Sequence, residues 1–268
     1  NCIESGKAYT AIAVTQGFWS VLTLWAFPRL VFMLKENPGY YSGRLQDRKI
    51  MSNVMIVRHG QANSAARDEA SYDQLSATGH QQAKWLGEYF GQIQPKFEKI
   101  YSGTLKRQIE TAQGINQFGL PHEQDARLNE MDYFGLAADL ERRHNIAYPT
   151  TQAEFAEQIK TILRYWKEEK ISSPIETYAH FQNRILDVVL DALAGQEKLL
   201  LVSSAGVIAA IAATVLKVEE DHCFRLFLSV PHTSLNSFEL IYNAPSLTQY
   251  CATPHLDLPE RIHAKTYI

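Results

Sequence analysis

The chain has 268 residues, of which 46% are hydrophobic and 21% charged, which is typical of a globular protein with a substantial core rather than of a disordered or fibrous chain. Its 26 Lys and Arg residues and 29 Asp and Glu residues give a net charge of -3, which disfavours a non-specific nucleic-acid binder and a polybasic membrane surface. Cys2, Cys223 and Cys251 are odd in number, far apart and not in metal-ligand spacing. We therefore expect no disulfide framework, no zinc site and a cytoplasmic location.

The first fifty residues differ in composition from the rest. The stretch between Lys7 and Arg29 contains no charge and is long enough to cross a bilayer, although Thr, Gln, Gly, Ser and Pro dilute it. It could be a weak membrane span, a helix packed on the main domain, or non-native sequence from an over-long gene prediction. The start at Asn1 and the candidate initiator Met51 favour the third interpretation. We expect an N-terminal extension over residues 1–50 and one main domain over residues 51–268, which faces the cytoplasm in each case because basic residues follow the apolar stretch.

From residue 51 onward, apolar runs typical of strands alternate with segments of helical period. A strand over residues 54–57 is followed by a helix for which Ser76 is the candidate N-cap. A short strand over residues 99–103 leads into a helix over residues 104–115 that we expect to bury Leu105, Ile109 and Ala112. This alternation predicts an α/β fold with a largely parallel central sheet flanked by helices.

The second half continues the same pattern. A helix is predicted over residues 152–167, and Ser173 with Glu176 forms a candidate capping box that opens a helix ending near Gly195. The run over residues 198–216 predicts a buried strand, a tight turn and an apolar helix. The alternating residues 233–242 predict an edge strand that closes the sheet.

Small residues together with polar side chains follow the predicted strands. These turns hold His59 with Gly60, Ser102 with Gly103, and residues 203–206. In parallel sheets, ligands bind beyond the carboxyl ends of the strands, where helix N-termini attract anions. The sequence therefore predicts a phosphate site at this edge of the sheet.

An ordered set of motifs resembles the histidine phosphatase superfamily, which also contains the cofactor-dependent phosphoglycerate mutases. The resemblance covers residues 51–268 and lies in the segments RHGQANSAARDEASYDQLSATGHQQA, SGTLKRQIETA, RLNEMDYFG, PIETYAHFQNR, LLLVSSAGVI, VPHTSLNSFEL and TPHL. It implies a three-layer α/β sandwich with a mostly parallel central sheet, and a phosphohistidine mechanism without metal or other cofactor.

The resemblance also implies a role for each motif residue. His59 is the expected nucleophile, since attack through a ring nitrogen would divide a difficult hydrolysis into two easier steps. Arg58 and Arg107 are expected to bind the phosphoryl oxygens with their guanidinium groups. Glu130 matches the proton donor to the leaving group, with Asp132 as the alternative.

The sequence departs from the family pattern at one turn. Where the family usually carries a second histidine in a Ser-His-Gly type turn, this chain has Ser204, followed by Ala205 and Gly206. It resembles a branch that opens with the same Arg-His-Gly-Gln-Ala sequence and carries serine at this turn. The backbone N–H groups of Ala205 and Gly206 could still bind phosphate. His232 is a candidate substitute for the missing imidazole, and Asn63 is a further candidate phosphate ligand.

We therefore expect a phosphomonoester hydrolase, with a mutase-type phosphotransferase and a catalytically weakened phosphate-binding or regulatory protein as alternatives. A small phosphorylated molecule is the expected partner. Nucleic acid and membrane are not expected as partners, and the sequence leaves open whether the protein forms a homodimer.

We expect the segment 132–151 to be rich in loops and to cover the pocket, with several side chains available to contact substrate: Tyr133, Phe134, Arg142, Arg143 and His144. The sequence does not distinguish sugar phosphates, phosphoserine, phosphohistidine and nucleotides as substrates.

Overall fold

A computed structural model describes residues 53–63, 66, 68–195 and 197–267. The expectations for residues 1–50 and for Met51 lie outside these residues. No helix in the described part of the chain combines the length and the apolar character needed to cross a membrane.

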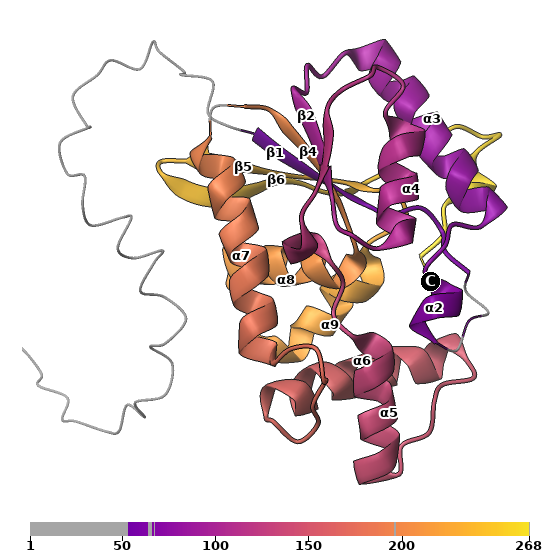
Figure 1. The fold of residues 1–268 in the computed structure, drawn as a ribbon, viewed down its shortest axis with the longest axis vertical. Coiled ribbons are helices and arrows are strands. Elements are labelled where there is room, and N and C mark those ends of the chain that lie inside the picture. The colour runs from indigo at the N-terminus through magenta and orange to yellow at the C-terminus, as the bar shows by residue number, and fades with distance from the viewer. Residues whose placement is uncertain (1–52, 64–65, 67, 196, 268) are drawn as a thin grey trace, which may run out of the picture. The chain divides into compact units, whose positions relative to one another are not determined.

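The central sheet has six strands in the order β3-β2-β4-β1-β5-β6 (Figure 1). β1 pairs in parallel with β4, and β2 pairs in parallel with both β3 and β4. β5 runs antiparallel to β1 and to β6, so the sheet is mixed, with a parallel half that carries the predicted site. The strands are β1 (Asn53–Arg58), β2 (Lys99–Ser102), β3 (His122–Gln124), β4 (Leu199–Ser203), β5 (Leu235–Ile241) and β6 (Ala244–Ala252).

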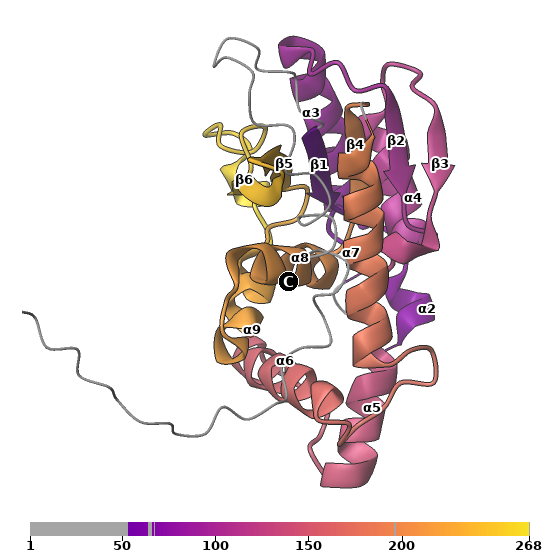
Figure 2. The same ribbon diagram turned by 90° about the vertical axis from the view of Figure 1, so that its left-hand side faces the viewer.

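Helices cover both faces of the sheet, which confirms the predicted three-layer α/β architecture (Figures 1 and 2). Alternate residues of β4 serve the two faces: Leu199 and Leu201 join the larger core cluster, and Leu200 and Val202 join the smaller one. Two of the described helices contribute to the smaller core cluster: α3 (Ala77–Ile93) and α4 (Lys106–Ile115). Five of them contribute to the larger core cluster: α5 (Tyr133–His144), α6 (Gln152–Lys167), α7 (Tyr178–Ala194), α8 (Ala205–Leu216) and α9 (Glu220–Ser229).

Two helix N-termini agree with the sequence and one differs. Ser76 caps α3 by accepting a hydrogen bond from the Gly79 N–H, and α6 has the predicted bounds. The predicted capping box of Ser173 and Glu176 is wrong, because α7 begins at Tyr178 with Thr177 as its cap. Glu176 instead forms a buried ion pair with Arg184, in which the carboxylate and the guanidinium are 2.6 Å apart. Both carboxylate oxygens of Glu176 bond to Arg184, so this side chain is not placed to accept from the backbone N–H of Ser173.

The C-terminal strand prediction is also corrected. The expected edge strand, β5, lies inside the sheet between β1 and β6. β6, which the sequence analysis missed, forms the edge after a short turn at Tyr242 and Asn243, both of which have positive φ. Most β6 residues are only half-buried, so the strand lacks the strong apolar run that marks an interior strand.

The buried face of α4 is more polar than the sequence predicts, although Ala112 and Ile115 belong to the smaller core cluster. Leu105 and Ile109 are only partly buried, whereas Arg107, Gln108 and Thr111 are buried together with the predicted Ala112. Apolar periodicity located the helix but not its orientation, because this helix turns its polar residues toward the functional site.

Candidate active site

The carboxyl ends of β1, β2 and β4 meet at one point of the sheet, as the strand-end turns predicted. His59 follows β1 directly, and its backbone N–H donates to the Ser203 carbonyl at the end of β4 over 2.8 Å. Gly60 packs so closely against the backbone of Gly79 that a Cβ there would lie 2.6 Å from the Gly79 carbonyl oxygen. The turn that carries His59 therefore requires glycine after the histidine.

The His59 ring is buried and held in one orientation. Its Nδ1 lies 2.7 Å from the Gly60 carbonyl oxygen, which can only accept, so Nδ1 carries the proton and Nε2 keeps its lone pair. Burial lowers the pKa of His59 well below its usual value, and the charges of Arg107 and Arg58 lower it further. The imidazole is therefore neutral near neutral pH, as a nitrogen nucleophile must be.

Two guanidinium groups lie beside this ring. Arg58 is 6% exposed and donates to the main-chain carbonyls of Val230 and Tyr267. Burial lowers the pKa of Arg58, and its neighbours Tyr72 and Glu130 favour the charged form. With both arginines at one end, the cavity offers strong donors for the oxygens of a phosphoryl group.

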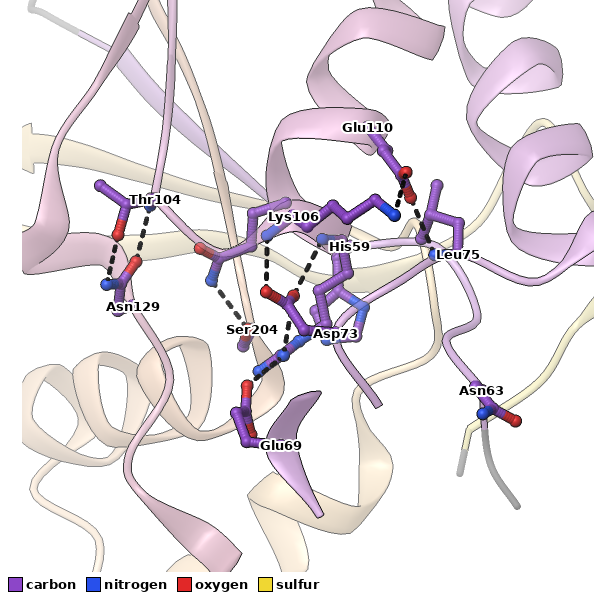
Figure 3. Close-up of polar contacts among 12 residues, drawn as sticks. His59, Asn63, Glu69, Asp73, Leu75, Thr104, Lys106, Glu110, Asn129 and Ser204 are labelled. Carbon is purple, nitrogen blue, oxygen red and sulfur yellow. Dashed lines mark hydrogen bonds and ion pairs between the residues drawn. The ribbon is translucent and has the colours of Figure 1, made fainter. Parts of the chain in front are cut away.

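Arg107 is oriented by two carboxylates and a ring. Its Nη1 contacts Glu69 at 2.5 Å and Asp73 at 3.1 Å, and Figure 3 draws the contacts of both carboxylates as dashed lines. The guanidinium carbon of Arg107 lies 4.7 Å from the centre of the Tyr72 ring. Asp73 also accepts hydrogen bonds from the backbone N–H groups of Lys106 and Arg107, and so ties the segment after α2 (Glu69–Tyr72) to the first turn of α4. Glu69, Tyr72 and Asp73 lie within the first family motif, but no role was predicted for them from the sequence.

Glu130 lies against the first turn of α8. Its carboxylate accepts hydrogen bonds from the backbone N–H groups of Gly206, at 2.9 Å, and Met131, at 3.0 Å. Burial nevertheless raises the pKa of Glu130, since the two N–H groups and the arginines only partly offset the loss of hydration. A buried carboxyl with a raised pKa can hold a proton for a leaving group.

Arg184 fixes the segment that carries Glu130, a function that the sequence analysis missed. Its guanidinium donates to the carbonyls of Arg127 and Asn129 at 2.7 and 2.8 Å while it pairs with Glu176. The two opposite charges, Glu176 and Arg184, lie eight residues apart in the sequence, but this spacing alone does not indicate that they form a buried ion pair.

Of the other predicted ligands, His232 and Ala205 line the cavity with His59, Arg58, Arg107 and Glu130. The remaining three are engaged elsewhere: Ser204 Oγ accepts from Gln108 Nε2, the Gly206 N–H donates to Glu130, and the Asn63 amide donates to the Ser71 carbonyl. Figure 3 shows Asn63 directed away from His59 and Asp73.

The cavity has a volume of about 370 Å³ and extends from His59 toward α5 and α6. The prediction that the segment 132–151 is rich in loops is wrong, because α5 fills more than half of it. Tyr133 and Phe134 line the cavity as expected. Arg142, Arg143 and His144 do not: both arginines pair with Asp139, and His144 lies near the Lys170 carbonyl. They form the last turn of α5, whereas its first turn faces the cavity.

A family model described as "Histidine phosphatase superfamily (branch 1)" matches residues 54–253. The chain belongs to this superfamily. The match covers the described sheet from β1 to the end of β6 and all of the predicted motifs except the last residues of TPHL, which confirms the resemblance seen in the sequence.

Individual relatives are distant. Mouse 6-phosphofructo-2-kinase/fructose-2,6-bisphosphatase 1 is 26% identical over 216 residues, which cover 78% of this chain and 43% of that protein. This histidine phosphatase chain thus spans less than half of the length of those curated relatives. The 2,3-bisphosphoglycerate-dependent phosphoglycerate mutase 1 of Latilactobacillus sakei subsp. sakei (strain 23K) is 34% identical over 95 residues, which cover 32% of this chain and 40% of that protein.

Solved structures share the fold. A phosphoserine phosphatase mutant from Entamoeba histolytica, in complex with phosphoserine, has a TM-score of 0.57 at 20% identity and covers 77% of this chain and 100% of its own. A mycobacterial glucosyl-3-phosphoglycerate phosphatase in complex with inorganic phosphate has a TM-score of 0.53 at 21% identity, with coverage of 77% and 100%. Together with the family model, these findings support phosphoryl-transfer chemistry in general for this histidine phosphatase.

Glu69 gives a first prediction for this histidine phosphatase. Its carboxylate contacts the Arg107 guanidinium that would bind a phosphoryl group, so a phosphate dianion must compete with it. We expect Glu69→Gln to tighten binding of inorganic phosphate about three- to tenfold, a modest gain because Glu69 is 41% exposed and solvent screens the pair. Isothermal titration of phosphate checks this, with Glu88→Gln as a carboxylate control on α3. Unchanged or weaker binding in the Glu69 variant would show that Glu69 orients Arg107 without competing for it.

Proposed function

We propose that the protein is a phosphomonoester hydrolase that acts through a covalent phosphohistidine on His59. The observation that carries this proposal is the hydrogen bond from His59 Nδ1 to the Gly60 carbonyl, which leaves Nε2 unprotonated beside Arg58 and Arg107. A fixed neutral imidazole next to buried cations is suited to attack on an anionic phosphoryl group.

The proposed reaction has two steps. His59 Nε2 attacks phosphorus, the P–O bond to the leaving group breaks, and protonated Glu130 gives its proton to the departing oxygen. A water molecule then attacks the phosphohistidine and transfers a proton to the Glu130 carboxylate, which releases inorganic phosphate and restores both groups. Arg58 and Arg107 would stabilise the charge on the phosphoryl oxygens in both transition states.

Two alternatives receive less support. A mutase-type phosphotransferase must hold a phosphorylated product in two orientations, but among the described lining residues only Arg58 and Arg107 are permanently cationic. A weakened binding or regulatory protein would follow from the loss of the second histidine. The presence of His59, Arg58, Arg107 and Glu130 in one cavity favours catalysis, because together they supply a nucleophile, ligands for the phosphoryl oxygens and a proton donor.

Turnover should not require a divalent cation, since Arg58 and Arg107 supply the positive charge that a metal ion would provide. The described residues contain no group of three or more His, Cys, Asp or Glu side chains arranged to hold a metal ion. We expect phosphate release from p-nitrophenyl phosphate to be the same with and without EDTA. Loss of activity with EDTA, restored by added Mg²⁺ or Zn²⁺, would contradict the proposal.

His232 is proposed as the group that takes over from the missing histidine. Its ring lines the cavity with its centre 5.8 Å from that of His59, and its Nδ1 bonds to Thr266, so Nε2 is the ring nitrogen that would serve a ligand. Burial lowers the pKa of His232 well below its usual value, and the neighbouring Arg58 charge lowers it further. We therefore expect the ring to take up a proton only when a phosphate dianion is bound.

We expect His232→Ala to lower kcat/KM about 10²-fold, as loss of an electrostatic donor does. Ser204→Ala should cost less than about tenfold, because the Ser204 hydroxyl bonds to Gln108 and does not line the cavity. Steady-state kinetics on one phosphomonoester compares the two variants, and thermal denaturation checks their folding. Similar losses in both variants would contradict the role proposed for His232.

A further inference from the structure

A continuous series of aromatic rings leads away from the candidate nucleophile. The Tyr72 ring lies 6.4 Å from His59 and 5.9 Å from Phe134, and Phe134 lies parallel to Tyr148 with 6.2 Å between ring centres. Tyr133 contacts the same pair and continues to Phe155. All of these rings line the cavity, which gives one wall an aromatic character from the phosphate end to α6.

Two of these rings are not explained by core packing. Tyr133, Tyr148 and Phe155 pack against the larger core cluster, but neither described cluster includes Tyr72 or Phe134 in its packing. Both side chains are half-buried. Tyr72 also packs against the Arg107 guanidinium, whereas the aromatic contacts of Phe134 are with Tyr72, Tyr133 and Tyr148. A half-exposed phenyl ring that lines a cavity and supports no core has apolar surface available to a ligand.

The same end of the cavity offers no charge to an anionic leaving group. The described lining residues beyond Phe134 are Tyr148, Pro149, Thr150, Thr151, Gln152, Phe155 and Phe227, none of them cationic. The N-terminus of α6 could attract an anion, but the Glu154 carboxylate already accepts from the N–H groups of Thr150 and Thr151 in a capping box. A second phosphate or a carboxylate there would meet a negative charge.

From this wall we infer that the substrates are phosphomonoesters whose leaving group carries an apolar, preferably aromatic, ring and no second anionic group. The inference rests on the proposed hydrolase function and concerns the same site. Arg58 and Arg107 would bind the phosphoryl group, while the leaving group would pack on Phe134 and Tyr148. Small phosphorylated carboxylic acids and bisphosphates would be poor substrates.

The first test compares kcat/KM for 2-phenylethyl phosphate and 3-phosphoglycerate. Both release a primary alcohol, so the ratio reports contacts of the leaving group rather than its acidity. We expect a preference of about 10- to 100-fold for the phenylethyl ester, the range for burial of one ring. An equal rate, or a preference for 3-phosphoglycerate, overturns the inference and leaves the hydrolase proposal intact.

The second test assigns the preference to the ring wall. Phe134→Ala should reduce the ratio about tenfold through loss of ring contacts. Phe118→Ala is the matched control, since Phe118 is 49% exposed and lies after α4, outside the cavity lining. An equal loss on both substrates in the Phe134 variant would show a purely structural role and overturn the assignment.

A binding measurement separates this inference from the proposed function. Benzylphosphonate and 2-carboxyethylphosphonate are titrated into the wild-type protein by calorimetry, because neither can be hydrolysed. If no phosphomonoester is turned over but benzylphosphonate binds at least about tenfold more tightly, the hydrolase proposal fails and the ring preference stands. Equal binding, or none, overturns the ring preference.

Discussion

Replacing His59 with alanine should abolish turnover, with a loss of kcat of about 10⁴-fold or more, as for removal of a catalytic nucleophile. The reason lies in the geometry of the ring. Its Nδ1 proton is held by the Gly60 carbonyl and the ring lines the cavity, so Nε2 is the nitrogen that would act as the nucleophile. Brief mixing with [³²P]-labelled phosphomonoester followed by acid-free denaturation should leave label on the wild-type protein and none on the His59→Ala variant.

The matched control is His80→Ala, since the His80 side chain is 57% exposed on α3 and does not line the cavity. It should retain wild-type activity and labelling. Inorganic phosphate should still bind to the His59→Ala variant, because Arg58 and Arg107 remain. Near-normal turnover without His59 would show that the nucleophile is misassigned, whereas loss of both turnover and phosphate binding would indicate that the site had collapsed.

The parts of this molecule that follow from local sequence were predictable. Residues Val54 to Val57 form an apolar run that ends at two groups costly to bury, Arg58 and His59, and this contrast located both the strand and the site. Ser76 correctly predicted the start of α3, because an N-cap hydrogen bond involves only residues within one helical turn. The family motifs then gave the three-layer fold, which the structure confirms.

The parts that depend on contacts between distant segments were not predictable. Arg107 meets Glu69 and Asp73, which lie more than thirty residues earlier in the sequence, and no periodicity signals that contact. Burial of Glu176 against Arg184 likewise overrode a favourable local capping sequence. Such pairs form when tertiary packing removes water from both charges, and local propensity carries no information about that process.

Glu130→Gln should slow hydrolysis of an alkyl phosphate about 10²- to 10³-fold, within the usual contribution of a general acid. The same change should cost less than about tenfold on p-nitrophenyl phosphate, because a nitrophenolate leaves without needing a proton. Glutamine keeps the size of the side chain and can still accept one of the two hydrogen bonds from Gly206 and Met131. An equal loss on both substrates would mean that Glu130 maintains the α8 turn rather than donating a proton.

The pH profile tests the same assignment independently. Burial raises the pKa of Glu130, so the protonated carboxyl that donates to the leaving group persists to higher pH than that of an ordinary glutamate. It is lost as the pH rises through this raised pKa. Burial and the two arginines lower the pKa of His59, so its imidazole stays unprotonated in weak acid. It becomes protonated, and so loses its nucleophilic lone pair, only at a pH well below the usual pKa of histidine. Alkyl phosphate hydrolysis should therefore be fastest in weak acid and fall toward alkaline pH, and Glu130→Gln should flatten the alkaline fall. If the variant keeps the wild-type alkaline limb, another group supplies the proton, and Asp132 is a poor candidate because its carboxylate bonds to the Gly135 N–H and the Ser173 hydroxyl.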